Sequence, residues 1–424
     1  MKHELLLVTC LWIGWTPAGC AQTLEVIPNR VMVDEVATIR ANGLQPNERV
    51  AIRGELVDGE EHAWASEAEF VADAQGTVDT SKQAPEKGSY KEISAMGLVW
   101  SMKPAEKHVE SYAGPRELGA QTIQFQLIRK GQGIASGQLE QHWIGDGVRQ
   151  IKVEGKLHGV LYLPAGSGRK PGVLVLGGSE GGVPRQKAAW LASHGYAALA
   201  LAYFRYEDLP QYLEAIPLEY FGTAIGWLRE RPEVDPEHVA VMGTSRGGEL
   251  ALQLGSMYPQ IAAVVAYVPA DVRYPSCCGN TDVPYAWTWT GKPLPYVPMR
   301  EVRHPDAAIK IQASIAVERT HGPILVISGK DDGVWESWAM ADAVVSRLKQ
   351  AHFEPRVERY EYPHAGHRAG RPEIVPTWHG SMRHPVSGRV MDVGGTASGD
   401  AESSMDAIGK VLAFLRESLQ GESK

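Results

Sequence analysis

Short runs of alternating apolar and polar residues fill the first third of the chain. They occur at residues 36–39, 50–52 and 123–127, with turn signals such as Asn42-Gly43 between them. This period of two residues is typical of half-buried β-strands. No long amphipathic helix interrupts the pattern. We therefore expect residues 22–145 to form an immunoglobulin-like β-sandwich.

The pattern changes after residue 145, where longer apolar runs alternate with helical periodicity. The nearly continuous apolar runs are residues 173–176, 197–201, 239–242, 262–268 and 324–328. Strands buried on both faces have this composition. The i, i+3, i+4, i+7 spacing of helices occurs at residues 221–228, 341–348 and 408–419. Alternating strands and helices predict a doubly wound parallel α/β sheet in residues 146–424.

The amino terminus has the order of segments found in a secretory signal peptide. Two basic residues precede an apolar run at residues 5–15, and small residues follow at 18–21. The apolar run is too short to span a bilayer permanently, and no later stretch is long enough. We expect cleavage after Ala21 and export to the periplasm or medium; without this signal the protein would be cytoplasmic. Lipid attachment at Cys20 is a second interpretation, which Pro17 disfavours.

Composition and charge narrow the class of protein further. The 424 residues are 44% hydrophobic and 22% charged, with 12 Trp, 15 Tyr and 6 Phe, as expected for a folded globular protein. A count of 42 basic and 50 acidic residues gives a net charge of −8, and no basic tract occurs. Nucleic acid is therefore not an expected partner.

The cysteines exclude a disulfide framework. Two of the four lie in or beside the expected signal, which leaves only the adjacent Cys277 and Cys278. Such a pair can form a strained vicinal disulfide or remain as two thiols, and the sequence leaves both open. No zinc-ligand spacing surrounds them.

A serine in a Gly-x-Ser-x-Gly motif is the candidate nucleophile. Directly after the apolar run 239–242 the chain reads GTSRG, and a helix-compatible stretch follows. In this strand, turn, helix context the glycines permit a sharp turn that presents the hydroxyl of Ser245 at the sheet edge.

A serine hydroxyl needs a base and an orienting acid, expected here in the chain order Ser, acid, His. The loop after the last apolar run contains Asp331 and Asp332. Its Gly-x-x-Asp spacing favours Asp332 as the acid. The segment YPHAGH then offers two histidines: His367, which follows a glycine, is the expected base, and His364 is its rival.

An oxyanion hole needs two backbone N–H donors. We expect one from Arg246 and the other from Ser179 or Glu180, in the glycine-rich loop after the first apolar run. This loop lacks both the Gly-x-Gly-x-x-Gly spacing and the Gly-Lys-Ser/Thr ending of phosphate-binding loops, so no cofactor is expected. The His-x-x-His spacing of His364 and His367 lacks further ligands, so no metal is expected.

With these residues in place, the chain resembles the family of acyl-CoA thioester hydrolases and bile acid-CoA:amino acid N-acyltransferases. The matching segments are MGLVW at 96–100, ALAYFRYEDLP at 200–210, LEYF at 218–221, SRGGEL at 245–250, GKDD at 329–332 with Trp335, YPHAGH at 362–367, and Gly394-Gly395. They extend over nearly the whole chain after the signal. The resemblance implies an immunoglobulin-like domain fused to an α/β-hydrolase domain with a Ser245, Asp332, His367 triad.

The nucleophile type distinguishes branches of this family. The amino-acid-conjugating branch is similar to this chain but has Cys at the position of Ser245. Cys holds the acyl group as a thioester that is reactive toward amines. Ser forms an oxygen ester, for which water is the natural acceptor. The resemblance therefore implies hydrolysis of a small-molecule acyl thioester such as an acyl-CoA of fatty acid metabolism.

Export conflicts with this substrate, because acyl-CoA belongs to the cytoplasm. The alternatives are an exported carboxylesterase or peptidase-like serine hydrolase acting on an ester, an acyltransferase, and an inactive binding protein. The segment after residue 268, with Cys277, Cys278, Trp287 and Trp289, is expected to form a lid over the acyl site, with core packing as the alternative role of its aromatic residues. Acyl chain length and oligomeric state do not follow from the sequence.

Overall fold

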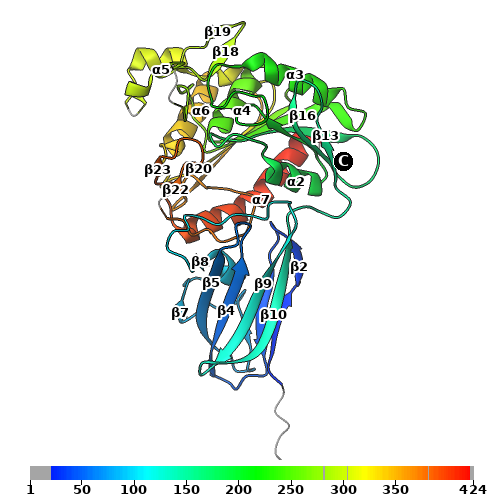
Figure 1. Cartoon of the computed structure of the whole chain (residues 1–424), viewed down its shortest axis with the longest axis vertical. Coiled ribbons are helices and arrows are strands. Elements are labelled where there is room, and N and C mark those ends of the chain that lie inside the picture. The colour runs from blue at the N-terminus through cyan, green and yellow to red at the C-terminus, as the bar shows by residue number, and fades with distance from the viewer. Residues whose placement is uncertain (1–20, 280–281, 303, 381, 421–424) are drawn as a thin grey trace, which may run out of the picture.

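A computed structural model describes residues 21–279, 282–302, 304–380 and 382–420. These residues form a β domain and an α/β domain, and the chain passes from one to the other after residue 142 (Figure 1). The predicted signal peptide lies almost entirely outside the described residues. Within the described part of the chain, no helix has the length and apolar character needed to cross a bilayer.

The β domain consists of two sheets that pack face to face around one core. The smaller sheet has the order β1 (Thr23–Ile27), β3 (Thr38–Asn42), β6 (Val78–Asp79). The larger has the order β2 (Arg30–Met32), β10 (Gln132–His142), β9 (Ala120–Arg129), β4 (Arg49–Val57), β5 (Ala63–Val71), β7 (Lys87–Gly88), with β8 (Lys103–Pro104) also on β5. Burial alternates along β4 and β9, which confirms the β domain predicted from the period of two. The short helix α1 (Gly97–Trp100) was not predicted.

The α/β domain is built on an eight-stranded sheet. Its order is β11 (Arg149–Lys152), β12 (His158–Leu163), β14 (Ala197–Ala202), β13 (Lys170–Leu176), β16 (Val234–Thr244), β17 (Ala263–Tyr267), β20 (Ile324–Gly329), β21 (Val357–Tyr362). The six strands from β14 to β21 are parallel, and five of them contain the apolar runs from which a parallel sheet was predicted. The edge strands β11 and β12 are antiparallel to their neighbours and were not predicted.

Helices cover both faces of this sheet. They are α2 (Arg185–Ser193), α3 (Leu218–Arg229), α4 (Arg246–Met257), α6 (Ser337–Gln350) and α7 (Ala397–Leu419). Along β13, Val173 and Val175 face the core shared with α2 and α7. The alternate residues Leu174 and Leu176 face the core shared with α3, α4 and α6. The buried parallel strands at the centre of the sheet are apolar on both faces, which is why their sequences are nearly continuous apolar runs.

Shorter strands and helices lie in the connections between these main elements. They are β15 (Ile216–Pro217), β18 (Trp287–Trp289), β19 (Lys292–Pro293), η1 (Met299–Glu301), α5 (Ala307–Ala313), η2 (Val317–Arg319), β22 (Met382–Arg383) and β23 (Val390–Met391). The last two form an antiparallel hairpin.

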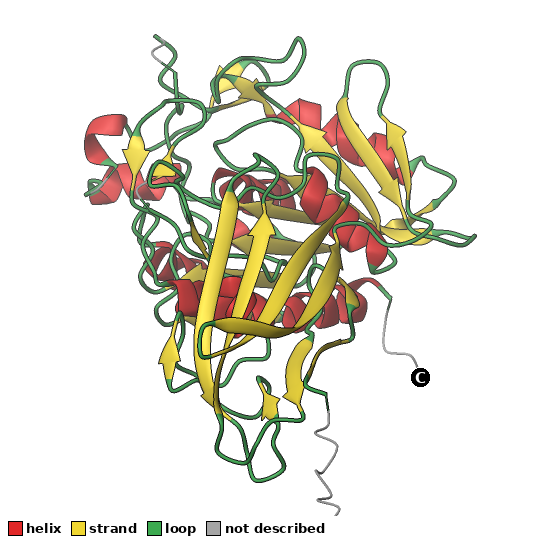
Figure 2. Ribbon diagram, turned by 60° about the horizontal axis from the view of Figure 1, so that its bottom comes forward, coloured by secondary structure: helices red, strands yellow, loops and turns green. Residues whose placement is uncertain are grey.

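One hydrophobic core continues from the β domain into the α/β domain through α2 and α7. Figure 1 shows these two helices between the sheet and the β domain, and Figure 2 looks from the β-domain side, with its yellow strands in front of the red helices. Polar contacts cross the same boundary. Asp34 Oδ2 accepts from Trp190 Nε1 at 2.9 Å and pairs with His194 Nε2 at 2.7 Å.

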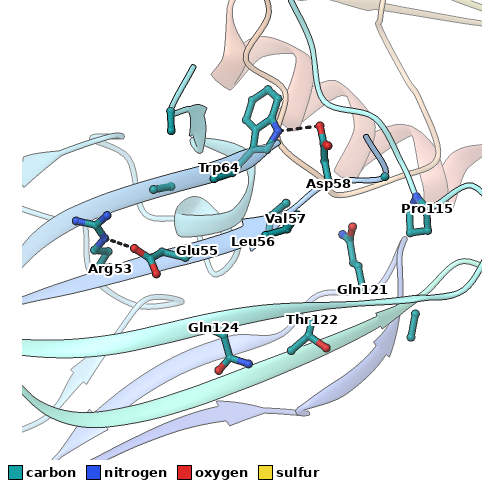
Figure 3. Close-up of a pocket in the computed structure, with 15 residues that line it drawn as sticks. Arg53, Glu55, Leu56, Val57, Asp58, Trp64, Pro115, Gln121, Thr122 and Gln124 are labelled. Atoms are coloured by element: carbon teal, nitrogen blue, oxygen red, sulfur yellow. Dashed lines mark hydrogen bonds and ion pairs between the residues drawn. The ribbon is translucent and has the colours of Figure 1, made fainter. Parts of the chain in front are cut away.

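A groove of about 650 Å³ lies between β4 and β9 at one end of the larger β sheet (Figure 3). It begins where the pairing of β4 with β9 ends, at Glu55 and Gln124. Trp64 Nε1 donates to Asp58 at 2.9 Å in its wall. None of the residues that line it is a candidate catalytic residue.

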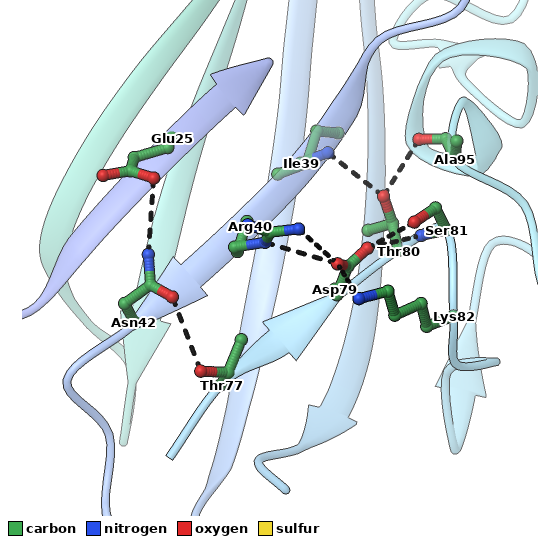
Figure 4. A network of polar contacts seen from close by, with 10 residues as sticks. All are labelled: Glu25, Ile39, Arg40, Asn42, Thr77, Asp79, Thr80, Ser81, Lys82 and Ala95. Carbon is green, nitrogen blue, oxygen red and sulfur yellow. Dashed lines mark hydrogen bonds and ion pairs between the residues drawn. The ribbon is translucent and has the colours of Figure 1, made fainter. Parts of the chain in front are cut away.

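A polar network at the edge of the smaller sheet is centred on Asp79 (Figure 4). Its carboxylate accepts from Arg40 Nη2 at 2.8 Å and from the backbone N–H and hydroxyl of Ser81 at 3.0 and 2.6 Å. Burial acts to raise the pKa of Asp79, but these hydrogen bonds outweigh it and the pKa lies below its ordinary value.

Candidate active site

Ser245 lies at the turn between β16 and α4, at the carboxyl end of a central strand. Its backbone has φ 57° and ψ −119°, a conformation that residues other than glycine rarely adopt. The backbone N–H of Ser245 donates to Tyr267 O at 2.9 Å on the neighbouring strand, which holds the turn against the sheet.

The glycines of the motif permit a close approach of backbones. A Cβ added to Gly243 would lie 1.9 Å from Gly247 O, and one added to Gly247 would lie 2.2 Å from Gly177 O. No side chain fits at either position without moving backbone atoms. The Gly-x-Ser-x-Gly spacing therefore follows from the packing of the turn.

The expected base and acid form a hydrogen-bonded chain with the serine. His367 Nε2 lies 2.9 Å from Ser245 Oγ, and His367 Nδ1 lies 2.8 Å from Asp332 Oδ2. A carboxylate can only accept, so Nδ1 carries the proton and Nε2 is free to accept from the hydroxyl. This is the arrangement in which a histidine can take the proton of a serine.

The Asp332 side chain is fully buried and held from several sides. Its Oδ1 accepts from the backbone N–H of Val334 at 2.9 Å and of Trp335 at 3.3 Å. The Trp335 ring packs edge-on against His367, with ring centroids 5.5 Å apart. The loop after β20 therefore fixes both the acid and the imidazole plane.

The rival residues pair with each other at the surface instead. Asp331 Oδ2 lies 3.4 Å from His364 Nδ1, and their side chains are 49% and 76% exposed. Ser245 Oγ instead bonds to His367. The geometry thus favours Asp332 over Asp331 and His367 over His364.

The glycine-rich loop after β13 lies beside the serine, as expected for an oxyanion loop. A Cβ added to Gly178 would lie 3.3 Å from Ser245 Cβ. Glu180 Oε1 accepts from the Gly178 N–H at 2.9 Å, and the Tyr203 hydroxyl donates to Gly177 O at 2.7 Å. Burial raises the pKa of Tyr203, so its hydroxyl remains a donor.

Arg246 begins helix α4, where backbone N–H groups lack partners within the helix. Its side chain is buried and donates to the carbonyl oxygens of Tyr274 and Pro275 at 3.2 and 2.8 Å. It also pairs with the buried carboxylate of Glu249 at 3.0 Å. Burial raises the pKa of Glu249, against the opposing effect of Arg246. Arg246 thus ties the segment after β17 to the start of α4.

The two tryptophans of that segment pack against the core of the α/β domain. Trp287 is 2% exposed, its Nε1 donates to Glu249 Oε1 at 2.6 Å, and its ring packs near Tyr203 and Phe221. Trp289 packs against Tyr258. The packing explanation therefore accounts for both tryptophans.

Cys277 and Cys278 form a vicinal disulfide, one of the two states that the sequence left open. It approaches the oxyanion loop. Cys278 Sγ lies 3.9 Å from Ser179 O and 3.6 Å from His384 Nε2.

His384 was not among the candidate residues identified from the sequence. The β22–β23 hairpin buries this side chain and brings its Nε2 to 2.9 Å from Ser179 Oγ. The two residues are 205 positions apart, and no motif links them. Only the glycine-rich loop itself signalled that Ser179 lies near the site.

Comparisons with known proteins agree with the two-domain arrangement. Residues 34–155 match the Acyl-CoA thioester hydrolase/BAAT N-terminal region. Residues 216–281 and 292–421 match the BAAT / Acyl-CoA thioester hydrolase C terminal family.

Several curated proteins are similar over nearly their whole length. Mus musculus acyl-coenzyme A thioesterase 6 is 30% identical over 422 residues, covering 95% of this chain and 98% of that protein. Mus musculus acyl-coenzyme A amino acid N-acyltransferase 1 is 30% identical over 425 residues, covering 93% and 97%. Among solved structures, an α/β hydrolase enzyme from a Medee basin deep-sea metagenome library aligns at a TM-score of 0.39 with 16% identity, over 65% of this chain and 99% of that one. From the two matched family regions and from the identity and coverage of the two mouse proteins, the chain belongs to the acyl-CoA thioester hydrolase/BAAT family of enzymes.

Proposed function

We propose that this protein is a serine-dependent acyl hydrolase that cleaves acyl-CoA thioesters through an acyl-enzyme intermediate. The observation that carries the proposal is the chain of hydrogen bonds from Ser245 through His367 to the buried Asp332. Membership of the family, with relatives named as acyl-coenzyme A thioesterases, supports the substrate class.

In the proposed mechanism, His367 Nε2 takes the proton of Ser245 as Oγ attacks the thioester carbonyl carbon. Asp332 keeps the imidazole in the required tautomer and stabilises the imidazolium. The backbone N–H of Arg246 and one from Ser179 or Glu180 stabilise the oxyanion. The carbon–sulfur bond then breaks, and His367 returns its proton to the leaving sulfur. Water, activated by His367, hydrolyses the resulting ester.

The serine nucleophile favours hydrolysis over N-acyl transfer. One relative is named as an amino acid N-acyltransferase, so the family alone does not separate the two reactions. An oxygen ester at Ser245 is a weaker acyl donor to amines than a thioester at cysteine would be. Water is therefore the proposed acceptor.

A second candidate function is hydrolysis of an oxygen ester outside the cytoplasm. The export predicted from residues 1–21 favours it, and the Cys277–Cys278 disulfide agrees with an oxidising compartment. The catalytic residues would be the same, and only the leaving group would differ.

A substrate panel on the purified protein separates the candidates. We expect acyl-CoA thioesters to be hydrolysed faster than matched oxygen esters and peptides, with free acid rather than an acyl-glycine formed in the presence of glycine. Turnover confined to oxygen esters would reject thioester hydrolysis and select the second candidate.

The nucleophile is tested independently of the substrate. A fluorophosphonate probe should label the wild type, and Ser245→Ala should abolish labelling and lower kcat by about 10⁴-fold or more. An unlabelled and inactive wild type would support a binding protein instead.

A further inference from the structure

A buried histidine outside the proposed triad contacts the oxyanion loop. His384 is 8% exposed, and its Nε2 lies 2.9 Å from Ser179 Oγ. Ser179 adjoins Gly178, whose added Cβ would lie 3.3 Å from Ser245 Cβ. Ser179 therefore belongs to the loop that lies beside the proposed nucleophile.

The surroundings of His384 determine which ring nitrogen carries the proton. Its Nδ1 faces the backbone N–H groups of Val386 and Ser387, each at 3.2 Å. An N–H can only donate, so Nδ1 is the acceptor and the neutral ring carries its hydrogen on Nε2. Burial lowers the pKa of His384 and keeps the ring neutral. Nε2 therefore donates to Ser179 Oγ.

This direction leaves the Ser179 hydroxyl hydrogen available for another acceptor. A hydroxyl has one hydrogen, and a bond that it accepts does not use it. The neighbouring loop is rigidly held, because Gly178 N–H is bound by Glu180 and Gly177 O by Tyr203. A donor fixed in advance at this place would stabilise negative charge on a substrate carbonyl oxygen.

The same tautomer argues against a metal site. Cys277, Cys278 and His384 offer ligand atoms within 4.8 Å of one another. The two sulfurs are joined in a disulfide, and Nε2, the ring nitrogen that faces them, bears the hydrogen. Neither group presents the lone pair or thiolate that a transition metal requires.

We propose that the Ser179 hydroxyl is a further oxyanion donor, and that His384 is a positioning residue which holds this hydroxyl in the donating orientation. The proposal rests on the proposed acyl hydrolase function. It adds a side-chain donor to the backbone donors of Arg246 and the loop, and it gives the β22–β23 hairpin a role in the reaction.

The test compares Ser179→Ala, Ser179→Thr and His384→Ala in steady-state hydrolysis of an acyl-CoA thioester. Ser179→Ala should lower kcat by about 10²-fold with little change in KM, because the donor acts on the transition state. Ser179→Thr keeps a hydroxyl and should recover most of the rate. Ser314→Ala removes a hydroxyl that donates to Lys310 O at the end of α5, in no part of the proposed site, and should behave as wild type.

A second measurement separates an electrostatic role from a structural one. A trifluoromethyl ketone thioether forms a tetrahedral adduct with serine, whereas a plain thioether analogue does not. Ser179→Ala should lower the affinity for the ketone by the same factor as it lowers kcat. It should leave the affinity for the thioether unchanged. In the double variant, His384→Ala should add little to Ser179→Ala, because it acts through that hydroxyl.

Wild-type kcat in Ser179→Ala, an equal loss of affinity for both inhibitors, or additive effects in the double variant would overturn the proposal. These outcomes differ from failure of the proposed function, which Ser245→Ala reports by itself. If the wild type hydrolyses only oxygen esters, the same variants measured with a p-nitrophenyl ester decide the role of Ser179, because that reaction also passes through an oxyanion.

Discussion

Two aspartates one position apart have opposite surroundings at the end of β20. The Asp332 carboxylate is fully buried and bonded to His367, whereas Asp331 is about half exposed and pairs with His364. The backbone turn directs one side chain inward and its neighbour outward. Their chemistry is therefore expected to differ although their residue type is the same.

Asp332→Asn should lower kcat on the order of 10³- to 10⁴-fold, because the amide no longer fixes the reactive tautomer of His367. Asp331→Asn is the matched control and should change kcat by less than about threefold. Steady-state kinetics on one thioester measures both. A larger loss in Asp331→Asn would reverse the assignment of the acid.

Asp79→Asn should destabilise the β domain by about 1 kcal/mol at pH 7, because the charged hydrogen bonds to Arg40 and Ser81 are lost. The pKa of Asp79 is lowered in the folded state. The contribution of Asp79 to stability is therefore present at pH values above its ordinary pKa of 3.8. It is lost as the pH falls through the lowered pKa of the folded state.

Urea unfolding of wild type and variant from pH 7 to pH 2.5 checks this prediction. The difference in unfolding free energy should shrink on acidification. The exposed Asp146, at 87% exposure, provides the control Asp146→Asn, for which no such trend is expected. A constant difference for Asp79→Asn across the range would contradict the prediction.

Local motifs made the candidate triad predictable. The contacts around the triad could not be predicted, because no local motif specifies them. The glycine spacing before Asp332 and before His367 identified both residues, because turns at strand ends constrain nearby positions. The bond between Ser179 and His384 joins a strand loop to a distant hairpin. Nothing in either segment specifies the other, so only the folded chain brings them together.

At the scale of elements, the turn from β16 to α4 depends on backbone contacts that a side chain would block. The strands on either side were predicted from continuous apolar runs, and helices α3, α6 and α7 from their period. The antiparallel edge strands β11 and β12 were not predicted. β11 is mostly exposed and has no alternating pattern, whereas β12 is buried at five of its six residues but forms only a short apolar run, which was not recognised as a strand.

Gly247→Ala should remove most fluorophosphonate labelling of Ser245, because the new Cβ would lie 2.2 Å from Gly177 O and push the oxyanion loop away. Gly226→Ala in α3 is the control, since nothing lies within 4 Å of its added Cβ. It should retain labelling and gain about 0.5–1 kcal/mol from helix propensity. Equal labelling of the two variants would contradict the role of the close approach.

At the scale of the whole molecule, the hydrolase sheet and the β domain share buried side chains and polar contacts. Asp34 of the β domain accepts from Trp190 and pairs with His194 on and after α2. Ile374, from the loop before α7, donates its backbone N–H to Val33 O at 2.8 Å and accepts from Gln141 at 3.0 Å. The sequence predicted two domains, but no motif in it indicated which residues join them.

Asp34→Ala should lower the free energy of unfolding by about 1–3 kcal/mol, because the Trp190 N–H would be left buried without an acceptor. Asp34→Asn retains a side-chain oxygen and should cost less. Urea titration followed by tryptophan fluorescence measures both variants. Equal stability of Asp34→Ala and the wild type would show that the contact contributes nothing to holding the domains together.

The core that runs through α2 and α7 has a consequence for how the molecule melts. A boundary made of shared apolar side chains cannot open without exposing both halves to water. Calorimetry should therefore record one cooperative transition for the whole chain rather than two. By the same reasoning, the α/β domain expressed alone would present the buried face of α7 to solvent and would aggregate. Its activity should therefore depend on the presence of the β domain.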